Sequence, residues 1–315
     1  MYRLIVRRLI LGLATLWVIS VLVFAGTEVL PGDVAAAILG REATAETLAG
    51  LRAELGLDRP LVVRYAEWLG NTLRGDMGVA LTNGVPVADI VGPRLMNTVW
   101  LALYAAVVAV PLALALGLLS AAYPNGFLDR IISSTTLFAI SVPDFVIAVI
   151  LVMIFSVELG WLPSMVNRPN WGDPFAMLGK AFLPMITLVL SMLAHMTRMT
   201  RAAVLDVLKS AYVEMALLKG APKRIIILRH ALPNALGPIV NVVALNLGYL
   251  ISGVVVIEVV FTYPGLGRLM VDSVAYRDVP QIQGVAMIFC AFYVVLNVLA
   301  DLGAIVANPR LRFAR

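Results

Sequence analysis

The sequence predicts an all-α membrane protein with six transmembrane helices, and its composition, its charge content and its long apolar runs carry this prediction. Of the 315 residues, 61% are apolar, whereas about 45 to 50% is ordinary for a soluble domain. Charged residues make up 14%, where about 25% is usual, and the mean hydropathy is +0.94. These values exclude a disordered chain, a coiled coil and a soluble multidomain protein.

The apolar runs match the thickness of a bilayer. A helix that rises about 1.5 Å per residue needs about 20 apolar residues to cross a hydrocarbon core about 30 Å thick. Six segments approach or exceed this length, and they are residues 9–29, 98–122, 134–157, 182–197, 236–260 and 285–307. The fourth segment is short, so we expect its helix to continue beyond the membrane.

The first segment has two interpretations. Arg3, Arg7 and Arg8 precede it, as basic residues precede the apolar core of a cleaved signal peptide. The apolar run is long, however, and five more spans follow it, which favours an uncleaved membrane anchor. We therefore expect a multi-pass protein that keeps its first span.

The distribution of basic residues predicts that both termini face the cytoplasm. With this orientation, fourteen Lys and Arg residues lie in the inner segments. The short outer loops carry only four, which are Arg168, Lys180, Arg268 and Arg277. Cytoplasmic loops normally carry the excess of basic residues. Orientation and contact with anionic lipid headgroups therefore account for the net charge of +5 without nucleic acid.

This topology divides the chain into three segments. Residues 1–29 are the N-terminus and the first transmembrane helix, 30–94 form a large external loop region, and 95–315 form a core of five helices. The core includes a cytoplasmic loop at residues 199–232. The external region either covers the spans or docks an extracytoplasmic partner, and the residues leave both interpretations open.

Two helices are expected in the external region. Thr44 is placed to cap the first helix, and Gly56 is placed to end it. The sequence Asp58-Arg59-Pro60 then starts the second helix, because proline is favoured in the first turn.

The cytoplasmic loop contains a short amphipathic helix over residues 210–219. Gly220 and Pro222 stop this helix, and Lys223 restarts the chain as a second one. Ala216 and Gly220 are four residues apart, which predicts a helix face with small side chains next to exposed leucines. Such a surface either docks a cytosolic partner or rests among lipid headgroups.

Asp144 is the most unusual polar residue of the spans. It follows Pro143 as the eleventh residue of the third span, where an ionised carboxylate costs at least about 2.5 kcal/mol. Either it lines a translocation pathway and attracts a cation, or it is protonated or paired, for instance with Arg198. His195 and Asn246 complete the predicted pathway set, although Asn246 is also suited to a hydrogen bond between helices.

A turn rich in glycine and proline follows the fifth span at its outer end. Such a turn is able to re-enter the membrane or to plug the mouth of a pathway. We interpret the following residues as elements of an outer gate: Glu258, Tyr263, Pro264, Gly265 and Gly267.

The chain offers no basis for catalysis of its own. It contains no Gly-x-x-x-x-Gly-Lys-Ser/Thr loop, because Gly179-Lys180 is followed by Ala181. Its two histidines are too scattered for a metalloprotease, and the single Cys290 cannot build a Cys-rich metal site. We predict neither a metal site nor an enzyme.

One motif resembles the cytoplasmic Glu-Ala-Ala loop of ABC importer permeases. It consists of Glu214-Met215-Ala216, three residues, Gly220, nine residues and His230-Ala231-Leu232-Pro233. Met215 stands where that family usually has Ala, and His230 stands where it usually has Ile. Further segments are similar to the dipeptide, oligopeptide and nickel branch of these permeases, namely 54–61, Gly75-Asp76-Met77-Gly78, Leu159-Gly160-Trp161-Leu162-Pro163, 263–269 and 308–312.

The resemblance implies a type I ABC importer permease fold in the cytoplasmic (inner) membrane of a prokaryote. It implies a second homologous permease subunit, two ABC ATPase subunits that bind ATP and Mg²⁺, and an extracytoplasmic substrate-binding protein. The assembled complex would then be an ATP-hydrolysing translocase. The implied ATPase-coupling residues are Glu214, Met215, Ala216, Leu217, Leu218, Lys219, Gly220, Ala221, Pro222 and Lys223.

The cargo implied by this branch is a small peptide, with nickel chelates, glutathione or opines as alternatives. A proton-coupled secondary transporter with Asp144 as its relay is a further alternative. Such carriers often show inverted repeats, and none is found in this chain. A membrane enzyme is the third class, and it lacks a motif.

Overall fold

The computed structural model describes residues 2–29, 44–54, 58–166, 177 and 179–307. Within these ranges the regular structure is helical, apart from one isolated antiparallel bridge between Val79 and Pro86. The predicted all-α fold is therefore confirmed. Gly56 and the segment 308–312, for which the sequence made predictions, lie outside the described residues.

The described part of the chain accounts for the expected spans. Five helices are long and apolar enough to cross a membrane, and the number is six if a bent helix pair counts as one span. The five are Val6–Val29, Val87–Ala122, Phe182–Leu208, Ile226–Leu250 and Val279–Leu299. The bent pair consists of Phe127–Ser141 and Asp144–Glu158.

The chain forms two compact units. Unit 1 contains Met1–Ile5, Thr98–Pro264 and Val295–Arg315. Unit 2 contains Val6–Asn97 and Gly265–Val294. Residues 265–294 thus pack with the N-terminal part of the chain.

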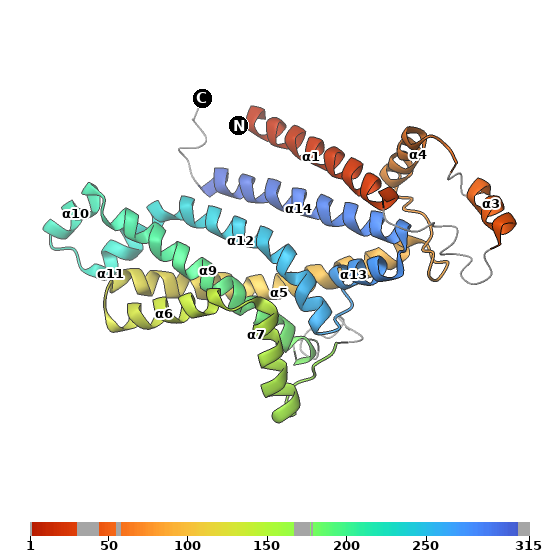
Figure 1. Cartoon of the computed structure of the whole chain (residues 1–315). Helices are drawn as coiled ribbons and strands as arrows, with labels where there is room; N and C mark the ends of the chain where they lie inside the picture. Colours follow the sequence, from red (N-terminus) through yellow and green to blue (C-terminus); the bar gives the residue numbers. More distant parts are fainter. Residues whose placement is uncertain (1, 30–43, 55–57, 167–176, 178, 308–315) are drawn as a thin grey trace. The chain divides into compact units, whose positions relative to one another are not determined.

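Unit 1 is organised around α9 (Phe182–Leu208). Figure 1 shows α9 beside α12 and α6, and these are its most extensive contacts. Over half of the most apolar stretch of α9 is buried (56%), against 28% for that of the span Ile226–Leu250, so α9 is the central helix. The other helices are α5 (Val87–Ala122, from Thr98 on), α6 (Phe127–Ser141), α7 (Asp144–Leu151), the π-helical η2 (Val152–Glu158), α10 (Ala211–Leu218), α11 (Lys223–Ile225), the π-helical η3 (Ile226–Ala231) and α12 (Leu232–Val260), together with the start of α1 (Tyr2–Val29, up to Ile5) and the end of α14 (Val279–Ala307, from Val295 on).

The fourth span continues past its apolar run, as predicted. The helix was expected to cover residues 182–197 in the membrane, and α9 extends to Leu208. At this end an apolar cluster joins α9 to three other elements, α5, η3 and α12, through Ala121, Val204, Ala231 and Ile239.

The prediction of one continuous third span was wrong. Helix α6 ends at Ser141, Val142 and Pro143 are extended, and α7 begins at Asp144. The two helices are bent by 100° at this break. Pro143 causes the break, because proline lacks an N–H donor and its ring pushes the preceding residue out of the helical region.

Unit 2 begins with α1 (Tyr2–Val29, from Val6 on), on which α4 (Leu61–Leu73) packs. Arg64 of α4 binds Glu28 of α1 at 2.6 Å, and Tyr65 hydrogen-bonds Ser20 at 2.8 Å. The ring of Phe24 lies 5.5 Å from the ring of Tyr65. The other helices of the unit are α3 (Ala45–Glu54), the start of α5, α13 (Leu266–Tyr276) and α14 (Val279–Ala307, up to Val294).

The two helices expected in the external region are confirmed. The Thr44 hydroxyl accepts a hydrogen bond from the N–H of Thr47 at 3.2 Å, which caps α3. Pro60 directly precedes α4 and accepts hydrogen bonds from its first turn at the N–H groups of Val63 and Arg64.

Candidate functional site

Helix α10 follows α9 with only Lys209 and Ser210 between them. The N–H of Ser210 binds the carbonyl of Val207 at 3.0 Å, and the Ser210 carbonyl accepts the N–H of Val213 at 3.0 Å. Val213 is fully buried, and α10 packs against α9 and η3. The corner between α9 and α10 is therefore closed by hydrogen bonds and by one buried anchor.

Gly220 ends α10 rather than lying on its face. The N–H of Gly220 binds the carbonyl of Leu217 at 2.9 Å, and the N–H of Ala221 binds the carbonyl of Ala216 at 3.1 Å. These two bonds form a Schellman motif, which needs a left-handed residue at the position of Gly220, and its φ is +76°. The predicted continuous helix face of Ala216 and Gly220 is wrong, because Gly220 has left the helix.

The surface of α10 mixes apolar and charged side chains. Met215, Leu217 and Leu218 are 55%, 52% and 77% exposed, and Glu214 is exposed as well. Leu217 and Leu218 are three and four residues after Glu214, so all three share one face. The predicted amphipathic pattern is therefore absent. An interfacial helix needs separate apolar and charged faces, so this arrangement favours a protein partner over lipid headgroups.

Asp144 lies between three helices of unit 1. The Ser191 hydroxyl of α9 donates a hydrogen bond to Oδ1 of Asp144, while a side chain on Gly253 of α12 would begin 3.7 Å from Oδ2. Asp144 is also the first residue of α7, where the dipole of the helix favours a carboxylate. Its partner is thus a hydroxyl rather than Arg198, which is exposed on α9.

His195 and Asn246 do not join Asp144 in one cluster. His195 is exposed on α9. Asn246 is buried on α12 and donates to the carbonyl of Val242 in its own helix at 2.8 Å, so this bond does not join two helices. The structure instead places Ser191 and Gly253 next to the carboxylate, and no sequence pattern pointed to either residue.

The predicted outer-gate residues are largely buried. Glu258 is fully buried and accepts a hydrogen bond from Thr98 at 2.5 Å, and its carbonyl accepts the N–H of Tyr263 at 2.8 Å. Burial, followed by the nearby Glu258, raises the pKa of Tyr263 above its usual range, so the phenol is neutral. These contacts fix the end of α12 within unit 1. In unit 2, Gly265 precedes α13 and Gly267 lies in its first turn, both buried. The gating role stays a prediction.

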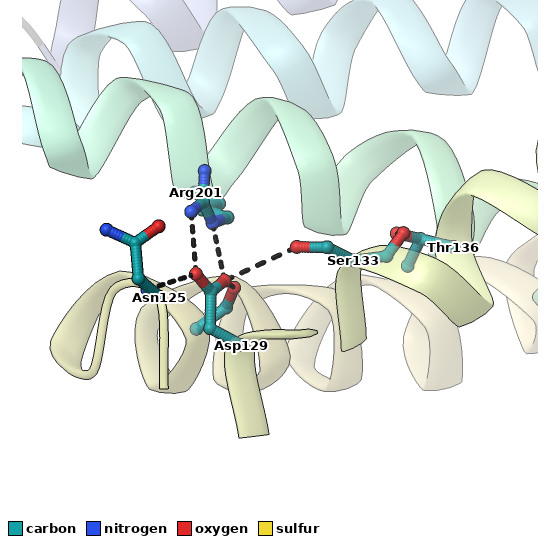
Figure 2. A network of polar contacts seen from close by, with 6 residues as sticks. Asn125, Asp129, Ser133, Thr136 and Arg201 are labelled. Atoms are coloured by element: carbon teal, nitrogen blue, oxygen red, sulfur yellow. Dashed lines mark hydrogen bonds and ion pairs between the residues drawn. The ribbon is translucent and has the colours of Figure 1, made fainter. Parts of the chain in front are cut away.

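A polar network that sequence reasoning missed surrounds Asp129 of α6 (Figure 2). Arg201 of α9 donates from Nε to Oδ1 at 2.7 Å and from its terminal nitrogen to Oδ2 at 2.8 Å. The N–H of Asn125 binds Oδ2 at 2.8 Å, and the Ser133 hydroxyl binds Oδ1 at 3.3 Å. The Ser120 hydroxyl of α5 donates to Oδ1 as well.

Arg201 binds both carboxylate oxygens of Asp129, and this carboxylate is nearly enclosed. The side chains of Asp129 and Arg201 are 5% and 27% exposed. In the sequence, Arg201 counted only as one of the basic residues that set orientation. Seventy-two positions separate it from Asp129, and no local pattern links the two.

In unit 1, apolar helices long enough to cross a membrane pack around α9, and α10 lies exposed beyond its end. This arrangement defines a polytopic membrane protein. The family described as "Binding-protein-dependent transport system inner membrane component" matches residues 113–313, and its N-terminal component matches residues 1–102. The chain belongs to this family: it is a permease subunit of a binding-protein-dependent ABC importer in the inner membrane.

Its relatives include the glutathione transport system permease protein GsiC of Escherichia coli (strain K12) and of Shigella dysenteriae serotype 1 (strain Sd197). Each is 38% identical over 309 residues, which cover 98% of this chain and 98% of the relative. The resemblance drawn from the loop motif is therefore confirmed. A permease component of this kind is not itself catalytic.

Proposed function

We propose that α10 and the turn after it bind an ABC ATPase subunit on the cytoplasmic side of the membrane. The coupling residues are the ten positions predicted from the loop motif, Glu214 through Lys223. A second homologous permease subunit completes the membrane part, and a second ATPase subunit binds beneath it. An extracytoplasmic substrate-binding protein delivers the cargo, and the ATPase subunits hold ATP and Mg²⁺.

The observation that carries this proposal is the mixed face of α10. Leu217 and Leu218 are exposed on the same side as Glu214. A groove on a protein is able to accept two apolar side chains and to pair the carboxylate with a basic residue at its rim. Lipid offers no such separate place for Glu214.

The connection between α10 and the membrane supports the same role. Because Ser210 and Val213 fix α10 to the end of α9, a displacement of α10 is also a displacement of the central helix. An ATPase that closes on ATP and moves α10 therefore changes how the helices of unit 1 pack. Binding energy at one site shifts a conformational equilibrium at another only through such differential contacts.

We propose small peptides as the cargo, with glutathione among them. The relatives named above transport glutathione, as their names state, and glutathione is a tripeptide with a free ammonium group. Asp144 supplies a carboxylate at the break between α6 and α7, where Oδ2 faces the small Gly253. We assign Asp144, with Pro143, His195 and Asn246, to the pathway. The outer gate consists of Glu258, Tyr263, Pro264, Gly265 and Gly267.

Uptake into proteoliposomes tests the function. The complete complex, reconstituted with its binding protein, is supplied with ATP on the ATPase side and with radiolabelled glutathione or dialanine on the other side. ATP-dependent accumulation of either probe supports the proposal. Accumulation driven by a proton gradient in vesicles without the ATPase subunits contradicts it.

The ATPase contact has a separate test. Replacing Glu214 with Arg reverses the charge on the face of α10, and the ATPase subunits should then fail to copurify with the membrane subunits. Replacing the exposed Asp206 of α9 with Asn is the control, since this carboxylate lies outside α10. Equal recovery of the ATPase subunits with both variants contradicts the assignment of α10.

A further inference from the structure

We propose that Asp129 and Arg201 are positioning residues of the transport cycle. Their ion pair, called here the Asp129–Arg201 clamp, fixes the register of α6 on α9, so that a displacement of α10 also moves the helix break at Pro143. This inference rests on the proposed coupling role of α10. It adds a defined route from that helix to the carboxylate of Asp144.

The first step of the route is the short distance between α10 and the clamp. Arg201 lies seven residues before the end of α9 at Leu208, which is about 10 Å along a helix. The closed corner at Ser210 joins this end to α10. Arg201 therefore moves with α10.

The second step is the geometry of the clamp. Two parallel N–H···O bonds of 2.7 and 2.8 Å fix the guanidinium of Arg201 to the carboxylate of Asp129. Asp129 is in turn fixed by donors from Ser120, Asn125 and Ser133. A bidentate pair defines one relative position of two helices, because a slide along the axis breaks both bonds.

The third step is that apolar packing does not provide the same fixation. Inside a membrane, helices are not held in register by the hydrophobic effect, since lipid tails are as apolar as leucine. The nearby hydroxyls of Thr197 and Thr200 on α9 are buried without a hydrogen-bond partner in the described structure. At this level of α9, the polar connection to α6 is therefore made by Arg201.

The fourth step is a second polar contact at the other end of α6. Asp144, three residues after the end of α6, binds Ser191 of α9. Ser191 and Arg201 are ten residues apart, about 15 Å along α9. Helix α6 thus runs antiparallel to α9 with a polar contact near each end. When α9 moves, α6 and the break at Pro143 follow it.

The conservative substitution Arg201→Lys tests this role. Lysine keeps the positive charge but lacks the planar fork that binds both carboxylate oxygens. The double variant Asp129→Asn with Arg201→Gln removes the pair without leaving a lone buried charge. Arg198→Lys is the matched control, because Arg198 is exposed on the same helix.

Two readouts are taken on reconstituted complexes with their ATPase subunits and binding protein. The first is the amount of radiolabelled glutathione or dialanine taken up per ATP hydrolysed. The second is the stimulation of ATP hydrolysis by the binding protein, which is measured without following the cargo. We expect Arg201→Lys and the double variant to assemble and to hydrolyse ATP, with both readouts lowered about fivefold or more. Arg198→Lys should match the wild type.

Two results would overturn the inference. One is an unchanged ratio of uptake to hydrolysis in the assembled variants, even if their thermal stability is lower. The other is that neither variant assembles, because the clamp would then serve only the fold. Failure of the proposed function is distinct: in that case the wild-type complex itself takes up no probe and shows no stimulation by the binding protein.

Discussion

Ser191 of α9 donates its hydroxyl to Oδ1 of Asp144, the first residue of α7. This bond explains how a carboxylate is tolerated in a span. One oxygen has a hydroxyl partner, and the start of a helix supplies a favourable dipole. The other oxygen lies beside Gly253 of α12, which itself has no side chain to cover it. Asp144 is therefore placed to accept one more donor.

Replacing Asp144 with Asn should selectively slow the uptake of cargo with a free ammonium group. A hydrogen bond to a charged group is worth about 1.5 to 3 kcal/mol, which corresponds to a loss of about tenfold or more. Uptake of dialanine and of N-acetyl-dialanine by reconstituted complexes is the measurement, and only dialanine should be affected. Asp89→Asn is the control, because Asp89 also lies in a first helical turn but is exposed on α5. Equal slowing of both peptides would remove Asp144 from cargo recognition.

The break at Pro143 shows how far the sequence predicted the fold. Hydropathy located the spans, since burial in lipid needs only a long apolar run. It joined α6 to α7 because a single proline lowers an apolar average only slightly. Pro143 itself was visible, and the rule that proline excludes a helical residue before it was sufficient to predict the break.

The sequence predicted the parts of the site that depend on local chemistry and missed those that depend on helix packing. The span of α10 and its end at Gly220 followed from local capping chemistry. The clamp of Asp129 with Arg201 did not, because it depends on how α6 packs against α9. The amphipathic pattern expected for α10 was absent, since Glu214 shares its face with two leucines.

Replacing Leu218 with Asp should weaken binding of the ATPase subunits. Leu218 is 77% exposed, so the change costs the isolated subunit little, but it places a charge in the proposed groove. Copurification of the ATPase subunits should fall at least about tenfold, since burying an unpaired charge costs several kcal/mol. Leu73→Asp is the matched control, because Leu73 of α4 is 80% exposed. If both variants retain the ATPase subunits equally, Leu218 is not at the interface.

Replacing Gly220 with Ala should loosen the end of α10. The site has open space for a methyl group, so the cost comes from the left-handed φ of +76° and is about 1 to 2 kcal/mol. Asn tolerates this region better, and Gly220→Asn should therefore be milder. ATP-dependent uptake should fall further in the Gly220→Ala variant than in the Gly220→Asn variant.

The control for this pair is Gly84→Ala in unit 2. Gly84 also has a left-handed φ, +71°, and open space around its missing side chain. It should lower the thermal stability by a similar amount while ATPase binding is retained. If Gly84→Ala and Gly220→Ala reduce ATPase binding alike, the effect is one of stability and not of α10.

Replacing Gly117 with Ala should destabilise unit 1 through the crossing of α5 and α9. The added Cβ would lie 2.7 Å from Cβ of Thr200 and 3.0 Å from the carbonyl oxygen of Thr197. The second neighbour is backbone, so the helices must separate, and such overpacking costs about 1 to 3 kcal/mol. Thermal unfolding of the purified subunit in detergent is the measurement.

Gly92→Ala is the matched control on the same helix, because nothing lies within 4 Å of its missing side chain. In a helix, Ala is favoured over Gly by about 1 kcal/mol, so this variant should be as stable as the wild type or more stable. The two changes are chemically identical and differ only in what the new methyl group meets. A Gly117→Ala subunit that unfolds at or above the wild-type temperature would show that α5 and α9 do not cross this closely in the membrane.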